Sequence, residues 1–461
     1  MRNLLMFLVF FGTVPATFIR PHIGILVWAW ISYMNPHRLT WGAAYDFRFA
    51  LICGVVTLLA WILSREPKRL PRGAVPFLMI ALMIWMSVTT LFAAQPEASM
   101  VWWERTTKIL LMALATLVLM QSRERIHALV WVIAVSLGFY GVKGAFWFMT
   151  STGGWVFGPA GSFISDNTSL ALALIMIVPL LRYLQTISAI LWVRFGLAMA
   201  GLLCVVSVIG SYSRGAFLAA SAMILMLVMR SRRRLLIGAL AIGVAMAVGL
   251  YAPERWVERM QSIANFQEDA SAMGRLQAWE FAINLALDRP FVGGGFRAFD
   301  DPNLWSRFAP EGTIPRAYHS IYFQMLGDHG FVGLGLFLLL GLVGWAAARR
   351  VIRSTRDRPD LRWANELARM IQVSIAGFAV GGSFLSLAGF DLYYHLLVIA
   401  FLLQVVVERE LGIRESQPYV LAGGAVDPSA GRRASSPMPA QNLDSGQNMR
   451  LKMSSPEPSE Q

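Results

Sequence analysis

Long apolar segments recur along almost the whole chain, and they limit its possible folds more than any other feature. Most of them approach the ~20 residues that an α-helix needs to cross a bilayer. They lie at 4–18, 23–34, 48–63, 75–93, 106–120, 127–149, 168–185, 188–210, 215–229, 234–251, 320–348, 367–390 and 393–408. Because lipid satisfies no backbone polar groups, this pattern predicts an all-α, polytopic integral membrane protein.

Composition supports this class and excludes others. Of the 461 residues, 56% are hydrophobic and only 15% are charged, which is too apolar for a soluble chain of this length. The net charge of +13 can indicate nucleic-acid binding, but the basic residues form short clusters between apolar segments. That distribution is typical of cytoplasmic loops of membrane proteins. We therefore expect contact with membrane lipids and no nucleic-acid partner.

The basic clusters also predict which loops face the cytoplasm. Those at 65–69, 123–125, 230–234 and 349–369 alternate correctly if all four are cytoplasmic. Segments 4–18 and 23–34 flank Arg20-Pro21-His22, and no small-residue cleavage site follows them, so we expect a retained anchor. If they form one broken crossing, the chain has about twelve transmembrane helices with both ends cytoplasmic. If they form two, the N-terminus is outside; we favour twelve.

A long polar stretch at 252–318 interrupts the apolar pattern on the outer side. Helix–helix connections usually have 2–8 residues, and much longer loops are functional or disordered. A helical period through Leu276, Trp279, Ile283 and Leu287 favours a folded helical loop. The predicted parts are an N-terminal transmembrane bundle (1–251), a periplasmic catalytic loop with amphipathic helices (252–318), C-terminal transmembrane helices (319–410) and a disordered cytoplasmic tail (411–461).

Three ionisable residues lie at the outer boundary under this topology: Arg214, Arg275 and His319. Each has an ordinary explanation, namely a snorkelling arginine, a charge on an amphipathic helix and a capping histidine. Together they favour chemistry. Arginine binds phosphate oxygens with two parallel N–H groups, and a neutral histidine accepts a proton from a hydroxyl near pH 7. This combination suits group transfer from a lipid (pyro)phosphate to an alcohol.

Other polar residues are secondary candidates. Asp328 and His329 lie inside a predicted span, where we expect a structural role. Asp391 and His395 lie near the last span. Neither nucleotide-binding nor zinc motifs occur, and Cys53 and Cys204 lie in apolar segments, so no cofactor is expected. The outer acids are scattered, so no metal site is expected.

Several segments carry recognisable motifs. They are Phe163-x-x-Asp166-Asn167, Ser213-Arg214-Gly215-Ala216-Phe217-Leu218, Gly274-Arg275-x-x-x-Trp279 followed by Pro290-Phe291-Val292-Gly293-Gly294-Gly295 and Phe299, and His319-Ser320-x-Tyr322 followed by Asp328-x-Gly330-x-x-Gly333. In this order they resemble the O-antigen ligase and polymerase superfamily over roughly residues 150–400. Ser320 and Asp328 depart from that family's usual Asn and Glu. Separately, residues 33–38 (Tyr-Met-Asn-Pro-His-Arg) resemble the start of O-glycosylation ligases associated with exosortase systems.

The resemblance implies a metal-independent, inverting glycosyltransferase of the membrane-embedded GT-C type in the bacterial inner membrane. Its donor would be a glycan on undecaprenyl pyrophosphate, and a ligase's acceptor would be the lipid A–core oligosaccharide at the periplasmic face. His319 would be the catalytic base, and Arg214 and Arg275 would bind the pyrophosphate. The expected supporting residues are Arg297, Arg316, Asp166, Asn167, Tyr212, Ser213, Trp279 and Asp391.

Other functions share part of this pattern. An O-antigen polymerase and a protein O-oligosaccharyltransferase would carry the same motifs and differ only in the acceptor. A flippase or transporter for lipid-linked oligosaccharides would instead need polar residues along a path through the midplane and inverted repeats. A folded outer loop that ends at a histidine argues against a transporter. Of the enzymes we favour the ligase, with the polymerase second.

Overall fold

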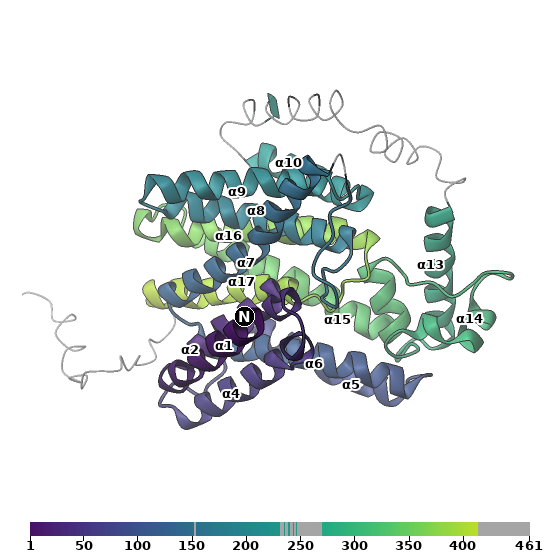
Figure 1. Cartoon of the computed structure of the whole chain (residues 1–461). Coiled ribbons are helices and arrows are strands. Elements are labelled where there is room, and N and C mark those ends of the chain that lie inside the picture. Colours follow the sequence, from purple (N-terminus) through teal and green to yellow (C-terminus); the bar gives the residue numbers. More distant parts are fainter. Residues whose placement is uncertain are drawn as a thin grey trace, which may run out of the picture. The chain divides into compact units, whose positions relative to one another are not determined.

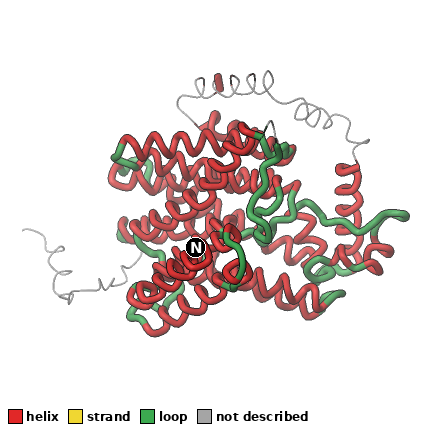
Figure 2. The backbone as a smooth tube through the Cα atoms, in the orientation of Figure 1, coloured by secondary structure: helices red, strands yellow, loops and turns green. Residues whose placement is uncertain are grey.

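The computed structural model describes residues 1–151, 154–230 and 270–413, with isolated positions between 231 and 269. One compact unit spans Met1–Ser416. The described chain is helical and contains no strand (Figures 1 and 2). Its α-helices are α1 Arg2–Ile19, α2 His22–Met34, α3 Ala43–Asp46, α4 Phe49–Leu63, α5 Ala74–Leu91, α6 Pro96–Leu119, α7 Arg123–Thr150, α8 Asn167–Ile187, α9 Leu191–Ile209, α10 Arg214–Arg230, α13 Ala270–Asp288, α14 Pro302–Phe308, α15 Ile321–Ser354, α16 Arg362–Gly381 and α17 Asp391–Glu410. The 3₁₀ turns are η1 Pro36–Leu39, η2 Ala298–Asp300, η3 Pro359–Leu361 and η4 Gly382–Phe384.

The predicted apolar segments correspond to these helices. Eight helical segments of the described chain are long and apolar enough to cross a membrane, and α2, α4 and α10 are shorter apolar helices. The polytopic all-α class is therefore confirmed, whereas the number of crossings and the GT-C type stay predictions. The segment predicted at 234–251, the first part of the loop (252–269) and the tail beyond 413 lie outside the described residues.

The first two helices differ in length and in burial. Helix α1 alone is long enough to cross a membrane. Helix α2 has 13 residues, or about 20 Å at 1.5 Å per residue, which is less than the ~30 Å of bilayer hydrocarbon. Unlike α1, whose apolar surface is largely exposed, α2 is mostly buried against α4 and α7.

Helix α17 is the most buried of the candidate spans. Of its membrane-length window, 94% is buried, and it packs against α15, α16 and α6. Its sequence from Leu396 to Leu403 is apolar on every side, as expected for a helix enclosed by others. One set of ends of the surrounding helices, together with the loops between them, carries the candidate site.

The second half of the predicted outer loop has a small hydrophobic core of its own. Helices α13 and α14 and turn η2 enclose Phe281, Leu285, Trp305 and Tyr318. The residues whose period predicted a helix here do not form its buried face, because Leu276, Ile283 and Leu287 are 41%, 41% and 66% exposed. The buried face combines Phe281 and Leu285 with the smaller residues Gly274, Ala278, Ala282 and Ala286. Small side chains let α13 approach α15 closely, and hydrophobic periodicity underweights them.

This loop is fastened to α15 through two glycine-containing segments, 290–295 and 327–331, which we call the glycine clasp. Three backbone hydrogen bonds of 2.9 Å join them: Gly294 N–H to Gly327 O, Gly295 N–H to Asp328 O and Phe331 N–H to Pro290 O. Helix α15 is kinked at Gly330, whose φ is 68°. A Cβ there would lie 2.3 Å from Phe291 O, so only glycine fits both the angle and the contact.

Inside the clasp, Asp328 and His329 have structural partners, as expected. Asp328 is buried and accepts hydrogen bonds from the Tyr318 hydroxyl (3.1 Å) and the Ala298 amide (3.3 Å). The His329 ring lies 2.7 Å from the Thr89 hydroxyl on α5. These contacts join the loop, α15 and α5 into one support.

The sidedness of the loop can be measured by labelling a single introduced cysteine. Asn303 is exposed on α14, whereas the native Cys53 and Cys204 are buried, so background labelling will be low. We expect Asn303→Cys to react with a membrane-impermeant maleimide in intact spheroplasts. Reaction only after lysis would place the loop in the cytoplasm and contradict the predicted topology.

Candidate active site

His319 lies between the folded loop and the first turn of α15. Its backbone amide donates a 2.9 Å hydrogen bond to the Ser386 hydroxyl, in the connection between α16 and α17. Its φ is 47°, in the left-handed region that histidine seldom adopts. A residue held there costs about 1–3 kcal/mol, and such residues concentrate at functional sites. The surrounding structure therefore holds His319 in one specific orientation.

The charges of three residues affect the pKa of the His319 ring: Arg275, Asp166 and Arg316. Although the residue is exposed, partial loss of hydration lowers its pKa below the ordinary 6.5, and this is the largest cause. Arg275 and Arg316 lower the pKa further, and Asp166 opposes them. The ring is thus neutral near pH 7 and able to accept a proton.

The two arginines come from different ends of the loop and meet at Gly274. A Cβ at Gly274 would lie 2.4 Å from Arg316 Nη1, so the guanidinium of Arg316 lies against the α13 backbone next to Arg275. Any larger residue would displace it. Two guanidinium groups beside a neutral histidine make a site suited to an anion with several oxygens.

Trp279, one turn after Arg275, positions the histidine. Its indole Nε1–H donates a 2.8 Å hydrogen bond to the carbonyl of Tyr318, the residue before His319. Its ring stacks on Phe323 of α15, with the centroids 4.8 Å apart. Trp279 therefore ties α13 to both sides of His319.

The start of α8 connects His319 to the Ser-Arg-Gly motif. Asp166 caps α8 by accepting hydrogen bonds from the amides of Thr168 (3.0 Å) and Ser169 (2.8 Å). The neighbouring Asn167 donates a 2.6 Å hydrogen bond to the carbonyl of Ser211. One helix end thus carries an acid that acts on His319 and an amide that holds the loop before Arg214.

That loop presents Arg214 at the first position of α10. The Ser213 hydroxyl caps the helix by accepting a 3.1 Å hydrogen bond from the Ala216 amide. Tyr212 is buried, has a φ of 55° and stacks on Trp155 with the centroids 5.7 Å apart. Tyr212 and Ser213 therefore shape the turn from which Arg214 projects.

Arg214 approaches the His319 region across η4. A Cβ at Gly215 would lie 3.0 Å from Cβ of Phe384, and a Cβ at Gly382 would lie 2.6 Å from the Ile321 side chain. The residue after Arg214 and the first residue of α15 therefore both lie against η4, the turn that connects the two motifs.

Two predicted supporting residues have partners elsewhere. Arg297 forms an ion pair with Asp300 and lies 5.5 Å and 5.1 Å from the ring centroids of Trp102 and Phe299. Asp391 is buried at the start of α17 and accepts a hydrogen bond from Ser32 of α2. Neither is among the charges that act on His319.

Ser386 is a contact that sequence reasoning missed. It lies in the connection between α16 and α17 and belongs to none of the motifs, so nothing in the sequence marked it. Over the described ranges, no group of three or more His, Cys, Asp or Glu side chains could hold a metal ion. Metal independence of the reaction stays a prediction.

The lowered pKa of His319 predicts the pH dependence of the reaction. If neutral His319 is the base, kcat/KM should fall on the acid side with a midpoint below 6.5, because the neutral form persists to lower pH than in free imidazole. Arg316→Gln removes a charge that lowers this pKa and should move the midpoint upward. Asp166→Asn removes a charge that raises it and should move the midpoint downward. Shifts in the same direction for both variants would contradict this role.

Two separate parts of the chain match known family models. Residues 199–338 match the model of the O-antigen ligase family, and this region contains Arg214, Arg275 and His319. Residues 1–189 match a family of unknown function (DUF5935). A search of curated proteins found no match. The motifs identified in the sequence and the family match agree, and residues 199–338 form a region of the O-antigen ligase family.

Proposed function

We propose that the protein is an O-antigen ligase of the bacterial inner membrane. It transfers a glycan from undecaprenyl pyrophosphate to a hydroxyl of the lipid A–core oligosaccharide at the periplasmic face. The observation that carries this proposal is the grouping of a neutral histidine with two guanidinium groups, at the junction of a folded loop and a membrane-length helix.

The chemistry assigns a role to each group. The acceptor oxygen attacks the anomeric carbon of the glycan, and the carbon–oxygen bond to the pyrophosphate breaks with inversion. His319 takes the proton of the attacking hydroxyl. The pyrophosphate leaves with the bonding electrons, and Arg275 and Arg214 stabilise its growing charge, with Arg316 in support. The energy comes from the donor, so no nucleotide is consumed.

Two further residues have positioning roles in this scheme. Trp279 holds the peptide that precedes His319, and Asn167 holds the loop that precedes Arg214. Their loss should weaken catalysis through misplacement, because a base must lie within hydrogen-bonding reach of the proton it removes.

Disruption of the gene tests the proposal, and the wild-type gene and His319→Asn serve as complementing forms. A ligase predicts loss of long-chain lipopolysaccharide, accumulation of full-length lipid-linked polymer, and rescue by the wild type alone. Accumulation of single repeat units on the lipid carrier would instead identify a polymerase. Unchanged surface glycans after disruption would refute both.

A further inference from the structure

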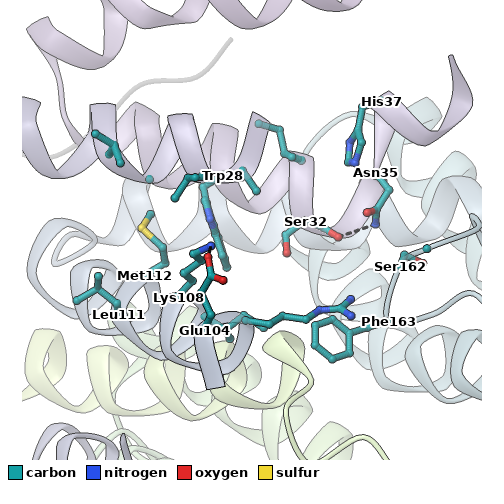
Figure 3. Close-up of a pocket in the computed structure, with 18 of the residues that line it drawn as sticks. Trp28, Ser32, Asn35, His37, Glu104, Lys108, Leu111, Met112, Ser162 and Phe163 are labelled. Carbon is teal, nitrogen blue, oxygen red and sulfur yellow. Dashed lines mark hydrogen bonds and ion pairs between the residues drawn. The ribbon is translucent and has the colours of Figure 1, made fainter. Parts of the chain in front are cut away.

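A cavity of about 390 Å³ lies apart from the residues around His319, among helices α2, α4 and α6 and the segment 161–163. Figure 3 shows part of its lining. Every lining residue falls between Trp28 and Phe163, within the half of the chain that matches a family of unknown function. Asn35 and His37 of the Tyr-Met-Asn-Pro-His-Arg segment contribute to its wall. Two residues of that segment therefore line a cavity, although neither has a role in the proposed transfer reaction.

Two cations from α6, Arg105 and Lys108, line this cavity. Lys108 forms an ion pair with Glu104 one turn earlier, and both side chains are about half exposed. The guanidinium carbon of Arg105 lies 3.7 Å from the ring centroid of Phe163 and 5.4 Å from that of Trp102. Aromatic contact at the face of a guanidinium leaves its N–H edge available for oxygen ligands.

Within the described ranges, Arg105 makes no hydrogen bond or ion pair with a protein group. The acid whose charge acts on it is Asp391, which already accepts a hydrogen bond from Ser32. The second charge that acts on it is the cation Arg38. An arginine largely removed from water needs an anionic partner, and the cavity is where one can bind.

The cavity changes character along its length. Leu111 and Met112 lie at one end of the view, Asn35 and His37 lie at the other, and Lys108 lies between (Figure 3). On α6 the lining extends from residue 101 to residue 112, about 16 Å at 1.5 Å per residue. The apolar end is completed by residues of α4: Ala50, Leu51, Gly54, Val55 and Leu58. One cavity thus combines a cationic, hydrogen-bonding part with an apolar part.

We propose that this cavity binds an anionic lipid, with a phosphate-type head group at Arg105 and Lys108 and a hydrocarbon chain between α4 and α6. The volume lies within the ~300–1,000 Å³ that is usual for ligand sites. A purely apolar lipid would leave Arg105 without an oxygen partner, and a free phosphate would leave the apolar part empty. The site is separate from the proposed transfer chemistry, and its test does not depend on activity.

The test uses the full-length protein in nanodiscs of zwitterionic phosphatidylcholine. The probe is dodecyl phosphate with a photoactivatable diazirine in its chain, and the labelled peptides are mapped by mass spectrometry. We expect labels on α4 and α6. The matching dodecanol probe should label these peptides far less, because it lacks the charge. Equal labelling by both probes would overturn the proposal.

Matched variants separate the head-group site from the chain site. Arg105→Gln and Lys108→Gln should each reduce labelling at subsaturating probe, by about tenfold or more for the largely buried arginine. Gly54→Leu should block the chain site, because only Met112 Sδ, at 3.5 Å, lies near the added Cβ and the rest of the side chain would fill the cavity. Lys108 is half exposed, so its variant tests the head-group site with little risk to folding.

Two control variants make the same changes on the exposed face of α9, Arg194→Gln and Gly196→Leu, where an added Cβ at Gly196 meets no atom within 4 Å. Both should label as the wild type does. Wild-type labelling by Gly54→Leu would refute the proposed site. Competition then identifies the source of the lipid: displacement by farnesyl phosphate indicates an isoprenoid phosphate, and displacement by phosphatidylglycerol indicates a glycerophospholipid. Displacement by neither would overturn the proposal.

Discussion

Replacement of His319 by asparagine should reduce glycan transfer by about 10²–10⁴-fold, the usual contribution of a general base. Asparagine is chosen because it tolerates the left-handed backbone that residue 319 adopts, with a φ of 47°. The hydrogen bond from the backbone amide to Ser386 is also preserved, since it involves no side-chain atom of residue 319. The substitution thus removes the imidazole and leaves the local fold in place.

Purified variant and wild type should therefore melt at similar temperatures and differ only in turnover of lipid-linked donor and acceptor. His319→Ala should lose as much activity and also some stability, because alanine is strained at positive φ. If His319→Asn transfers glycan at the wild-type rate, the base must be another group.

Arg275→Lys and Arg214→Lys should each reduce activity by about 10²–10³-fold. Lysine keeps the charge but lacks the planar fork that binds two phosphate oxygens at once, and losing a stabilising donor at a developing charge typically has an effect of this size. The matched control is Arg307→Lys, in the same loop. Arg307 is 66% exposed and pairs with Asp288, so this variant should retain nearly full activity.

The same assay tests whether arginines alone stabilise the pyrophosphate. Transfer should continue in excess EDTA, because Arg275 and Arg316 already supply positive charge beside His319. Loss of activity in EDTA with recovery on addition of Mg²⁺ or Mn²⁺ would show that a metal ion binds the leaving group, and would refute the arginine mechanism.

The helices were predictable because membrane spans have a strong local signal. Runs such as 127–149 and 168–185 correspond closely to α7 (Arg123–Thr150) and α8 (Asn167–Ile187). The buried face of α13 was not predictable from the period through Leu276, Ile283 and Leu287, because those residues are exposed and the buried face combines Phe281 and Leu285 with glycine and alanine. Close packing of small residues depends on the partner helix, which no local pattern describes.

The candidate site likewise contains some residues that the sequence indicated and others that it did not. Motif order indicated His319 and Arg275, and the structure brings them together with Arg316 and Asp166. Arg297 was expected beside them because it is an outward arginine, yet its ion pair with Asp300 depends on a turn that sequence alone does not specify. Ser386 was missed because its role is a single hydrogen bond, which its hydroxyl accepts from the backbone amide of a residue distant in the chain. No sequence pattern predicts such a contact.

The glycine clasp has a consequence for genetics. Gly293 and Gly330 carry no chemical group, yet a Cβ at either would lie within 2.6 Å of a backbone carbonyl on the opposite segment. Random mutagenesis that selects for loss of surface glycan should therefore recover these glycines as often as His319 or Arg275. Inactive alleles will fall into two groups: glycine variants with reduced amounts of protein, and His or Arg variants with normal amounts. Protein abundance would separate alleles that detach the loop from those that remove its chemistry.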